Sequence, residues 1–209
     1  SHGFVVVSPN ARNNVITKLD DDSGDMVAAI DWAIANEIVG PRVDATRKAV
    51  AGVTSGGSAA VAAASREQSI RAVVLWDTEK STVAETLAGN VSVPVLAYFS
   101  DANNCNGSGS GIATFQQFIG PRFGFKMAGS HFCDVENPSD NACAILCAGL
   151  ADSGRFNRIA RYTVAFLESY LKCEPTTMGY VNGDLAKADS TIQILPDTKG
   201  ITMPPASCV

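Results

Sequence analysis

The sequence predicts an α/β fold of three layers, in which helices cover both faces of a mostly parallel sheet. Apolar runs rich in β-branched residues alternate along the chain with segments of helical periodicity, as they do in βαβ units. These runs also lack the regular polar alternation of half-exposed strands, which is typical of strands buried on both faces.

Five apolar runs are expected to form the strands of this sheet: residues 3–8, 47–53, 70–77, 93–100 and 122–128. Helical patterns are expected at residues 25–38, 57–68, 111–119 and 155–172. The first helix is predicted to face the core with Met26, Ile30, Trp32, Ile34 and Ile38. Residues 103–111, rich in Asn, Gly and Ser, predict a flexible loop, and the tail after Pro175 is predicted to be irregular.

A chain of 209 residues suits one domain, and we expect residues 1–209 to form it. Because the chain opens directly on an apolar run, we expect an N-terminally incomplete domain whose sheet lacks its first strands. The run also indicates a chain that was processed or truncated. Residues 174–209 are expected to be an irregular tail tethered by a disulfide.

The net charge of −5 gives no electrostatic basis for binding nucleic acid or an anionic membrane. The apolar runs are far too short to span a bilayer. No cofactor is expected, and a zinc site is not expected because no C-x-x-C pair occurs and the chain has only two histidines, His2 and His131.

The six cysteines are even in number and lie in the later, loop-rich part of the chain, which predicts disulfides and an oxidising, secretory compartment. The alternative is six free thiols in a cytosolic protein. A bridge between Cys173 and Cys208 would tether the tail to the last helix. The other four cysteines are expected to pair among themselves, and Cys143 and Cys147, one helical turn apart, each with a different partner.

The segment Gly52–Gly57 (G-V-T-S-G-G) lies between a predicted strand and a predicted helix. This is the context in which G-x-S-x-G forms a nucleophile elbow, here with Thr54 at the apex. A frame centred on Ser55 would place Val53 where a side chain crowds the turn, so Thr54 fits better. The alternative is a glycine-rich turn in which Thr or Ser caps a helix.

Candidates for the rest of a catalytic triad follow in the order nucleophile, acid, histidine. Asp101 and Asn103 come after the run at 93–100, and His131 comes after the run at 122–128. Carboxyl ends of parallel strands are where such folds place their sites. His131 can act as base toward Thr54, with an acid holding its tautomer. The alternatives are a surface-loop histidine and a strand-terminal aspartate.

Several segments carry a resemblance that covers most of the chain: S-H-G-F-V-V-V-S-P at 1–9, D-M-V-A-A-I-D-W-A at 25–33, G-V-T-S-G-G at 52–57, V-P-V-L at 93–96, A-G-S-H-F-C-D at 128–134 and Y-T-V-A-F-L-E-S-Y-L-K at 162–172. The sequence resembles the branch of α/β-hydrolases that contains chlorophyllases, bacterial polyester hydrolases and dienelactone-hydrolase-like esterases. The resemblance implies carboxylic-ester hydrolysis by a Ser-His-Asp triad.

In comparison with that branch, Thr54 replaces the nucleophilic serine. Asn103 falls at the position of the acid, and Asp101 could take its place only if the loop shifted its register. The resemblance implies an oxyanion hole in which the Ser55 N–H is one donor and the second lies before Ser1. It also implies a sheet edge that a protein partner would cover. Trp76 would form a wall of an open, lidless cleft, or else a core residue at a strand end.

Two hypotheses follow. The favoured one is a hydrolase-fold protein with a degenerate triad that serves as a binding or accessory subunit of a larger assembly. The alternative is an active, secreted carboxylic ester hydrolase that uses Thr54 or relies on Asp101.

Overall fold

The computed structural model describes residues 2–10, 19–136, 141–147 and 149–201. Its sheet has five strands in the spatial order β1-β2-β3-β4-β5. The strands are β1 (Lys48–Val53), β2 (Ile70–Trp76), β3 (Val95–Phe99), β4 (Arg122–Met127) and β5 (Ile192–Ile194). The first four are parallel and β5 runs antiparallel to β4. The predicted α/β class with a mostly parallel sheet is confirmed.

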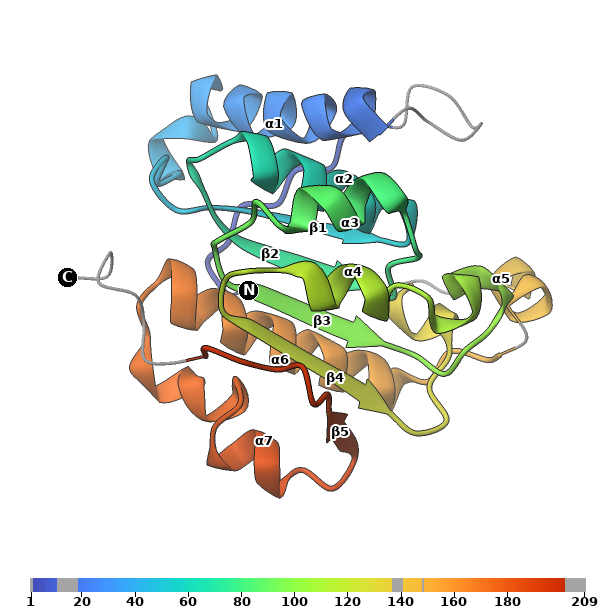
Figure 1. The fold of residues 1–209 in the computed structure, drawn as a ribbon. Helices are drawn as coiled ribbons and strands as arrows, with labels where there is room; N and C mark the ends of the chain where they lie inside the picture. Colours follow the sequence, from blue (N-terminus) through green and yellow to red (C-terminus); the bar gives the residue numbers. More distant parts are fainter. Residues whose placement is uncertain (1, 11–18, 137–140, 148, 202–209) are drawn as a thin grey trace.

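Helices cover both faces of the sheet (Figure 1). One face carries α1 (Leu19–Ala35), α2 (Ser55–Arg66), α3 (Thr82–Ala88) and α4 (Ile112–Gln117), and the other carries α6 (Ser153–Leu171) and α7 (Asp184–Ala188). The remaining helices are α5 (Asn141–Leu146) and the 3₁₀ helices η1 (Gly40–Arg42), η2 (Asn104–Gly109), η3 (Phe132–Val135) and η4 (Pro175–Tyr180).

Alternate residues of the central strands enter opposite cores, as strand geometry requires. In β2, Val73 and Leu75 pack under the α1–α4 layer, while Val74 packs under α6. Every residue of β3 is buried. This double burial is why the sequence of β3 is an unbroken apolar run and why that of β2 is interrupted only by the exposed Arg71.

The predicted strand at residues 3–8 is wrong. Residues 2–10 belong to no strand, and the Val6 side chain is 85% exposed. In the described part of the chain, β1 pairs only with β2, so no ladder partner reaches this segment. The segment is held by α6 instead: Lys172 donates to the carbonyl of His2 and lies 4.3 Å from the ring centroid of Phe4.

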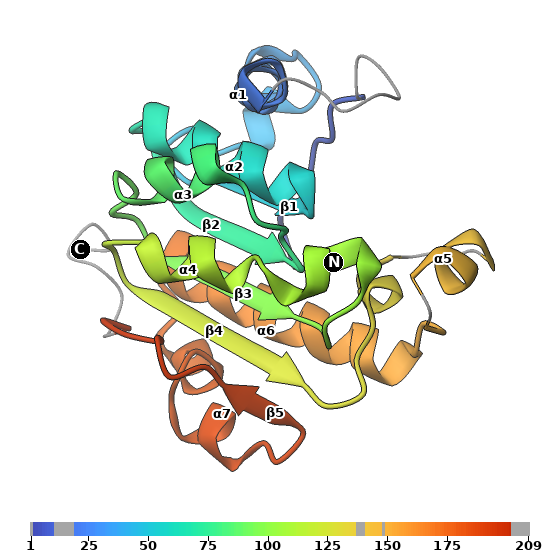
Figure 2. The same ribbon diagram turned by 45° about the vertical axis from the view of Figure 1, so that its right-hand side comes forward.

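The predicted inward face of the first helix is correct only in part. Met26 and Ile30 pack against the core, but Trp32 is 58% exposed and Ile38, beyond the end of α1, is 75% exposed. Trp32 lies two residues after Ile30 and is therefore turned about 200° around the axis. Because α1 lies over α2 at the margin of the sheet, only a narrow stripe of its surface is covered (Figure 2).

The tail is not irregular as predicted, because η4, α7 and β5 all lie beyond residue 174. Its strand pairs with β4, where Leu195 N–H donates to the Gly124 carbonyl at 2.8 Å. The sheet therefore has five strands as expected, but the fifth comes from the end of the chain and not from residues 3–8. The short helix α3 was not predicted.

Candidate active site

Thr54 is the single residue between β1 and α2, and its backbone is strained. Its φ of 45° and ψ of −117° lie in a region that β-branched residues rarely occupy. Such a conformation costs about 1–3 kcal/mol and is found where a site demands it. The turn is tight because a Cβ at Gly52 would lie 2.1 Å from the carbonyl oxygen of Gly56. A side chain at position 52 would therefore open the turn.

Ser55 opens α2, and its side chain is exposed. Its backbone N–H belongs to the first helical turn, where N–H groups have no acceptor within the helix. Such a group is available to an anionic oxygen beside Thr54. The hydroxyl of Ser55 lies on the helix and not at the apex of the turn, in keeping with the choice of Thr54 as the elbow residue.

Asp101 follows β3 and contacts the backbone of the loop that carries His131. Its carboxylate accepts a hydrogen bond from the N–H of Gly129 at 3.0 Å, and its own N–H donates to the carbonyl of Ser130 at 3.1 Å. Among the described residues, no hydrogen bond joins this carboxylate to the imidazole of His131. The structure therefore brings Asp101 beside the loop that carries His131, with its carboxylate engaged by the main chain.

Asn103 is used to fold its own loop. Its side-chain oxygen accepts from the N–H of Cys105 at 2.8 Å, and its amide nitrogen donates to the carbonyl of Asp101 at 2.8 Å. It caps η2, a turn that is stabilised further by the buried side chain of Asn106. The predicted flexible loop at 103–111 is thus a hydrogen-bonded helical turn.

Asp77, at the end of β2, is a buried acid that the sequence reasoning passed over. Its carboxylate accepts hydrogen bonds from the Ser100 N–H at 3.0 Å, from the Ser100 hydroxyl and from the Asn106 amide at 3.2 Å. Burial raises the pKa of the Asp77 carboxyl above its ordinary value, against the effect of these donors. An acidic residue directly after a predominantly apolar strand was the signal that could have found it.

His131 follows β4 and is half-buried. Its ring packs directly on the main chain of Gly149, where a Cβ would lie 2.2 Å from the imidazole Cγ. Its backbone N–H donates to the carboxylate of Asp134 at 2.8 Å. In the described chain, no hydrogen bond joins this imidazole to the hydroxyl of Thr54. The two lie at the carboxyl ends of β1 and β4 without direct contact through a hydrogen bond.

Asp134 connects the His131 loop to the start of α6. Its fully buried carboxylate also accepts from the Arg155 guanidinium at 2.6 Å and from the Asp152 N–H at 2.8 Å. A buried charge with this many partners is satisfied, and removing one partner would leave it uncompensated. The loop that carries His131 is therefore held in place by an ion pair that the sequence pattern did not predict.

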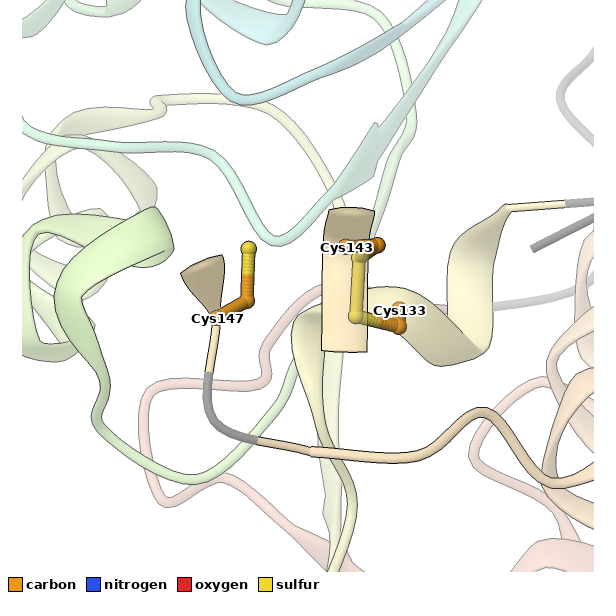
Figure 3. A group of neighbouring side chains, drawn as sticks. All are labelled: Cys133, Cys143 and Cys147. Atoms are coloured by element: carbon orange, nitrogen blue, oxygen red, sulfur yellow. A yellow bond between two sulfur atoms is a disulfide. The ribbon is translucent and has the colours of Figure 1, made fainter. Parts of the chain in front are cut away.

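Two disulfides join α5 to the two loops that carry the candidate residues. Cys133, two residues after His131, is bonded to Cys143 (Figure 3). Cys105, two residues after Asn103, is bonded to Cys147. The prediction that Cys143 and Cys147 pair with different partners is confirmed. The helix α5 therefore forms a strap between the loops that follow β3 and β4.

A further cysteine is bonded, and three of the bonded sulfurs lie close enough together to raise the question of a metal site. Cys173 is disulfide-bonded, and its predicted partner Cys208 lies outside the described residues. The sulfurs of Cys133, Cys143 and Cys147 lie within 4.8 Å of one another. All three take part in disulfides, so none offers the thiolate that a metal needs.

Trp76 lies on the α6 side of the sheet. Its indole N–H donates to the hydroxyl of Thr163 at 3.1 Å, and its ring packs in the hydrophobic cluster under α6. The described contacts tie it to the scaffold, which is the core alternative for this residue.

Comparison with known proteins gives one informative similarity. No protein-family model matches the sequence. The chain is 28% identical over 135 residues, 64% of its length, to Lipase 1 of Moraxella sp. (strain TA144). The match spans 41% of that lipase. Together with the mostly parallel α/β fold, it suggests an α/β-hydrolase and, at a coarse level, a hydrolase-like function.

The compartment is addressed only by the cysteines and the helices. The two disulfide-bonded pairs fit an oxidising location. Among the described helices, none combines the length and the apolar character that crossing a bilayer requires.

Proposed function

We propose that this chain is an α/β-hydrolase-fold protein of the esterase branch that it resembles, secreted, and able to bind carboxylic esters at an impaired triad. Turnover is expected to be very slow or absent. The observation that carries the proposal is the use made of the two candidate acids. Asn103 has no negative charge and caps η2, and the Asp101 carboxylate is engaged by Gly129.

The chemistry of a triad explains why this arrangement impairs turnover. The acid of a triad holds the histidine in one tautomer and stabilises the imidazolium that forms. An amide at that position supplies no charge for the second task. Thr54 adds a methyl group beside the attacking oxygen, which restricts how its hydroxyl can be aimed. Both effects act on the transition state and leave ester binding intact.

The test separates binding from turnover. Ester binding is measured by ligand-observed NMR with phenyl butyrate, and turnover is measured with p-nitrophenyl butyrate. We expect binding that His131→Ala weakens, with turnover close to the uncatalysed rate. The matched control is His2→Ala, because His2 lies near Glu168 of α6 and outside the candidate site. Absence of ester binding by the unmodified protein would reject the proposal.

An active ester hydrolase is the second candidate, and the strained backbone of Thr54 supports it. A φ of 45° at a β-branched residue is costly, and strain of this kind is characteristic of catalytic turns. In this alternative a small shift frees Asp101 from Gly129 and turns it to His131. Robust hydrolysis of p-nitrophenyl butyrate that is lost in both Thr54→Ala and His131→Ala would decide for it.

The accessory role also calls for a protein partner, and β1 is where we propose that it binds. In the described chain β1 pairs on one side only, so its outer backbone groups are available for strand addition. Exposed Val6 and Trp32 belong to the segments that precede this strand. Size-exclusion chromatography with the native secretion medium should show a complex, which Ala49→Pro and Ala51→Pro at that edge would weaken.

A further inference from the structure

The segment from α5 to Leu150 displays apolar side chains that the folded protein leaves uncovered. Ile145 is 79% exposed, Leu146 is 70% exposed and Leu150 is 76% exposed. Single exposed aliphatic residues are ordinary, but three within six positions form a concentration that calls for an explanation. We call these three residues the α5 patch.

The α5 patch is fixed in place. Cys143 and Cys147, on the same short segment, are bonded to Cys133 and Cys105. Because both cysteines are buried, Ile145 and Leu146 between them cannot turn inward without breaking a covalent bond. These two side chains are thus held outward, unlike those of a loop that can collapse onto the surface. Leu150 lies beyond the second bridge and directly follows Gly149, against which the ring of His131 packs.

The α5 patch adjoins the candidate active site. The helix α5 projects beyond the carboxyl ends of the parallel strands in both views (Figures 1 and 2). Gly149, between Leu146 and Leu150, carries the ring of His131 against its main chain. A molecule that covers the patch would therefore lie at the rim of the site.

The α5 patch is also electrically neutral. No charged residue occurs from 141 to 151, although 18% of the chain is charged. A partner recognised through ion pairs would need charges here, and a neutral hydrocarbon surface does not. The area is also small, because three aliphatic side chains fall short of the roughly 800 Å² per partner that a stable protein interface buries.

We infer that the α5 patch docks the protein on the neutral, apolar surface of aggregated esters and so presents them to the site beside His131. This inference rests on the proposed function, since it states the physical form of the ester that is bound. The contribution of each side chain is hydrophobic burial, which does not depend on salt.

The test uses flotation with a trioleoylglycerol emulsion coated with phosphatidylcholine. The variant Ile145→Ser/Leu146→Ser/Leu150→Ser should lose roughly tenfold or more of the emulsion-bound fraction. The control Val6→Ser/Ile38→Ser/Ile119→Ser removes three exposed apolar side chains elsewhere and should float like the unmodified protein. Binding of the unmodified protein should persist at high salt.

Separate measurements keep the two proposals apart. His131→Ala should float normally, because adsorption on the surface depends on the α5 patch and not on an ester bound beside His131, and the patch variant should bind soluble phenyl butyrate normally. Circular dichroism checks that the patch variant is folded. The single variant Leu146→Lys, which changes only one exposed side chain, checks that the loss of flotation does not come from a loss of folding. An unmodified protein that stays in the aqueous phase would overturn the inference, and so would a patch variant that still floats. Sedimentation that shows a dimer abolished in the patch variant would reassign the patch to a second copy of the chain.

Discussion

At the level of single residues, Thr54 and Asn103 determine what the candidate site can do. The backbone around Thr54 has the tight turn of a nucleophile elbow, with glycines where side chains cannot fit. Its side chain, however, is a secondary hydroxyl, and Asn103, which the resemblance puts at the position of the acid, is an amide. The backbone geometry of the turn therefore follows the esterase pattern, whereas the side chains at Thr54 and Asn103 depart from it.

The first prediction is that Thr54→Ser alone raises p-nitrophenyl butyrate turnover by less than about tenfold, because the acid would still be missing. Thr54→Ser/Asn103→Asp should exceed the product of the two single effects, since triad members act as a unit. Steady-state rates of the four proteins give the comparison. Strictly additive effects would show that Asn103 does not occupy the position of the acid.

The second prediction concerns Asp77, whose pKa burial raises in the folded protein. Between the unfolded pKa near 3.9 and the higher folded pKa, the folded state binds more protons, so stability falls as pH rises. The free energy of unfolding of the unmodified protein should therefore fall relative to that of Asp77→Asn as pH rises from 4 to 7. Urea denaturation across this range measures it, and a difference that moves the other way would contradict the assignment.

At the level of elements, the loops after β3 and β4 are held by covalent bonds as well as hydrogen bonds. The Cys105–Cys147 and Cys133–Cys143 bridges both end on α5, and Asp134 ties the second loop to Arg155 of α6. The described parts of the segment between β4 and α6 are consequently braced. This bracing is what holds His131 and the α5 patch relative to each other.

The third prediction ranks the two bridges by loop length. Cys105–Cys147 spans 42 residues and Cys133–Cys143 spans 10. By chain entropy, removing the first should cost about 4 kcal/mol of unfolding free energy and removing the second about 3 kcal/mol. Denaturation of the paired Cys→Ser variants tests this, and a larger loss for the short bridge would show that native-state contacts outweigh chain entropy.

At the level of the whole molecule, the end of the chain completes the sheet. Arg122 of β4 donates from its side chain to the carbonyls of Phe118 and Asp197, the latter at 2.8 Å. Its backbone pairs with Lys199. Because this residue is buried, the guanidinium serves as a clamp between the tail and the parallel strands. We therefore propose that residues 1–209 behave as one domain.

The fourth prediction is that Arg122→Met lowers the free energy of unfolding by about 2–4 kcal/mol, because one buried carbonyl and one part-buried carbonyl lose their donors. The matched control is Arg71→Met on β2, where the arginine is exposed and the change should lie within about 0.5 kcal/mol. Hydrogen exchange should become faster at 192–199 first. Two separate unfolding transitions in the unmodified protein would contradict the single domain.

Much of the fold was readable from local patterns. The four parallel strands were predicted at 47–53, 70–77, 93–100 and 122–128, within two residues of their observed bounds, because buried strands leave mostly apolar runs in the sequence. The tight turn at Thr54 was predicted because only glycine permits the close approach at Gly52. Cys143 and Cys147 had to bond elsewhere because a helical turn holds their side chains in a geometry unsuited to a mutual bridge.

Other features were decided by contacts between distant segments. Residues 3–8 have the composition of a strand, but a strand exists only where a neighbour accepts its hydrogen bonds, and none of the described strands reaches them. The modest tail at 192–194 became a strand because the margin of β4 was open to it. The partners of Asp101, Asn103, Asp77 and Asp134 likewise come from tertiary neighbours. The sequence by itself determined which segments are apolar enough to form strands and where the turn must be tight, since these depend on neighbouring residues along the chain. Strand pairing and the engagement of each carboxylate were decided only in the tertiary structure, because hydrogen-bond donors and sheet margins are supplied by residues far away in the sequence.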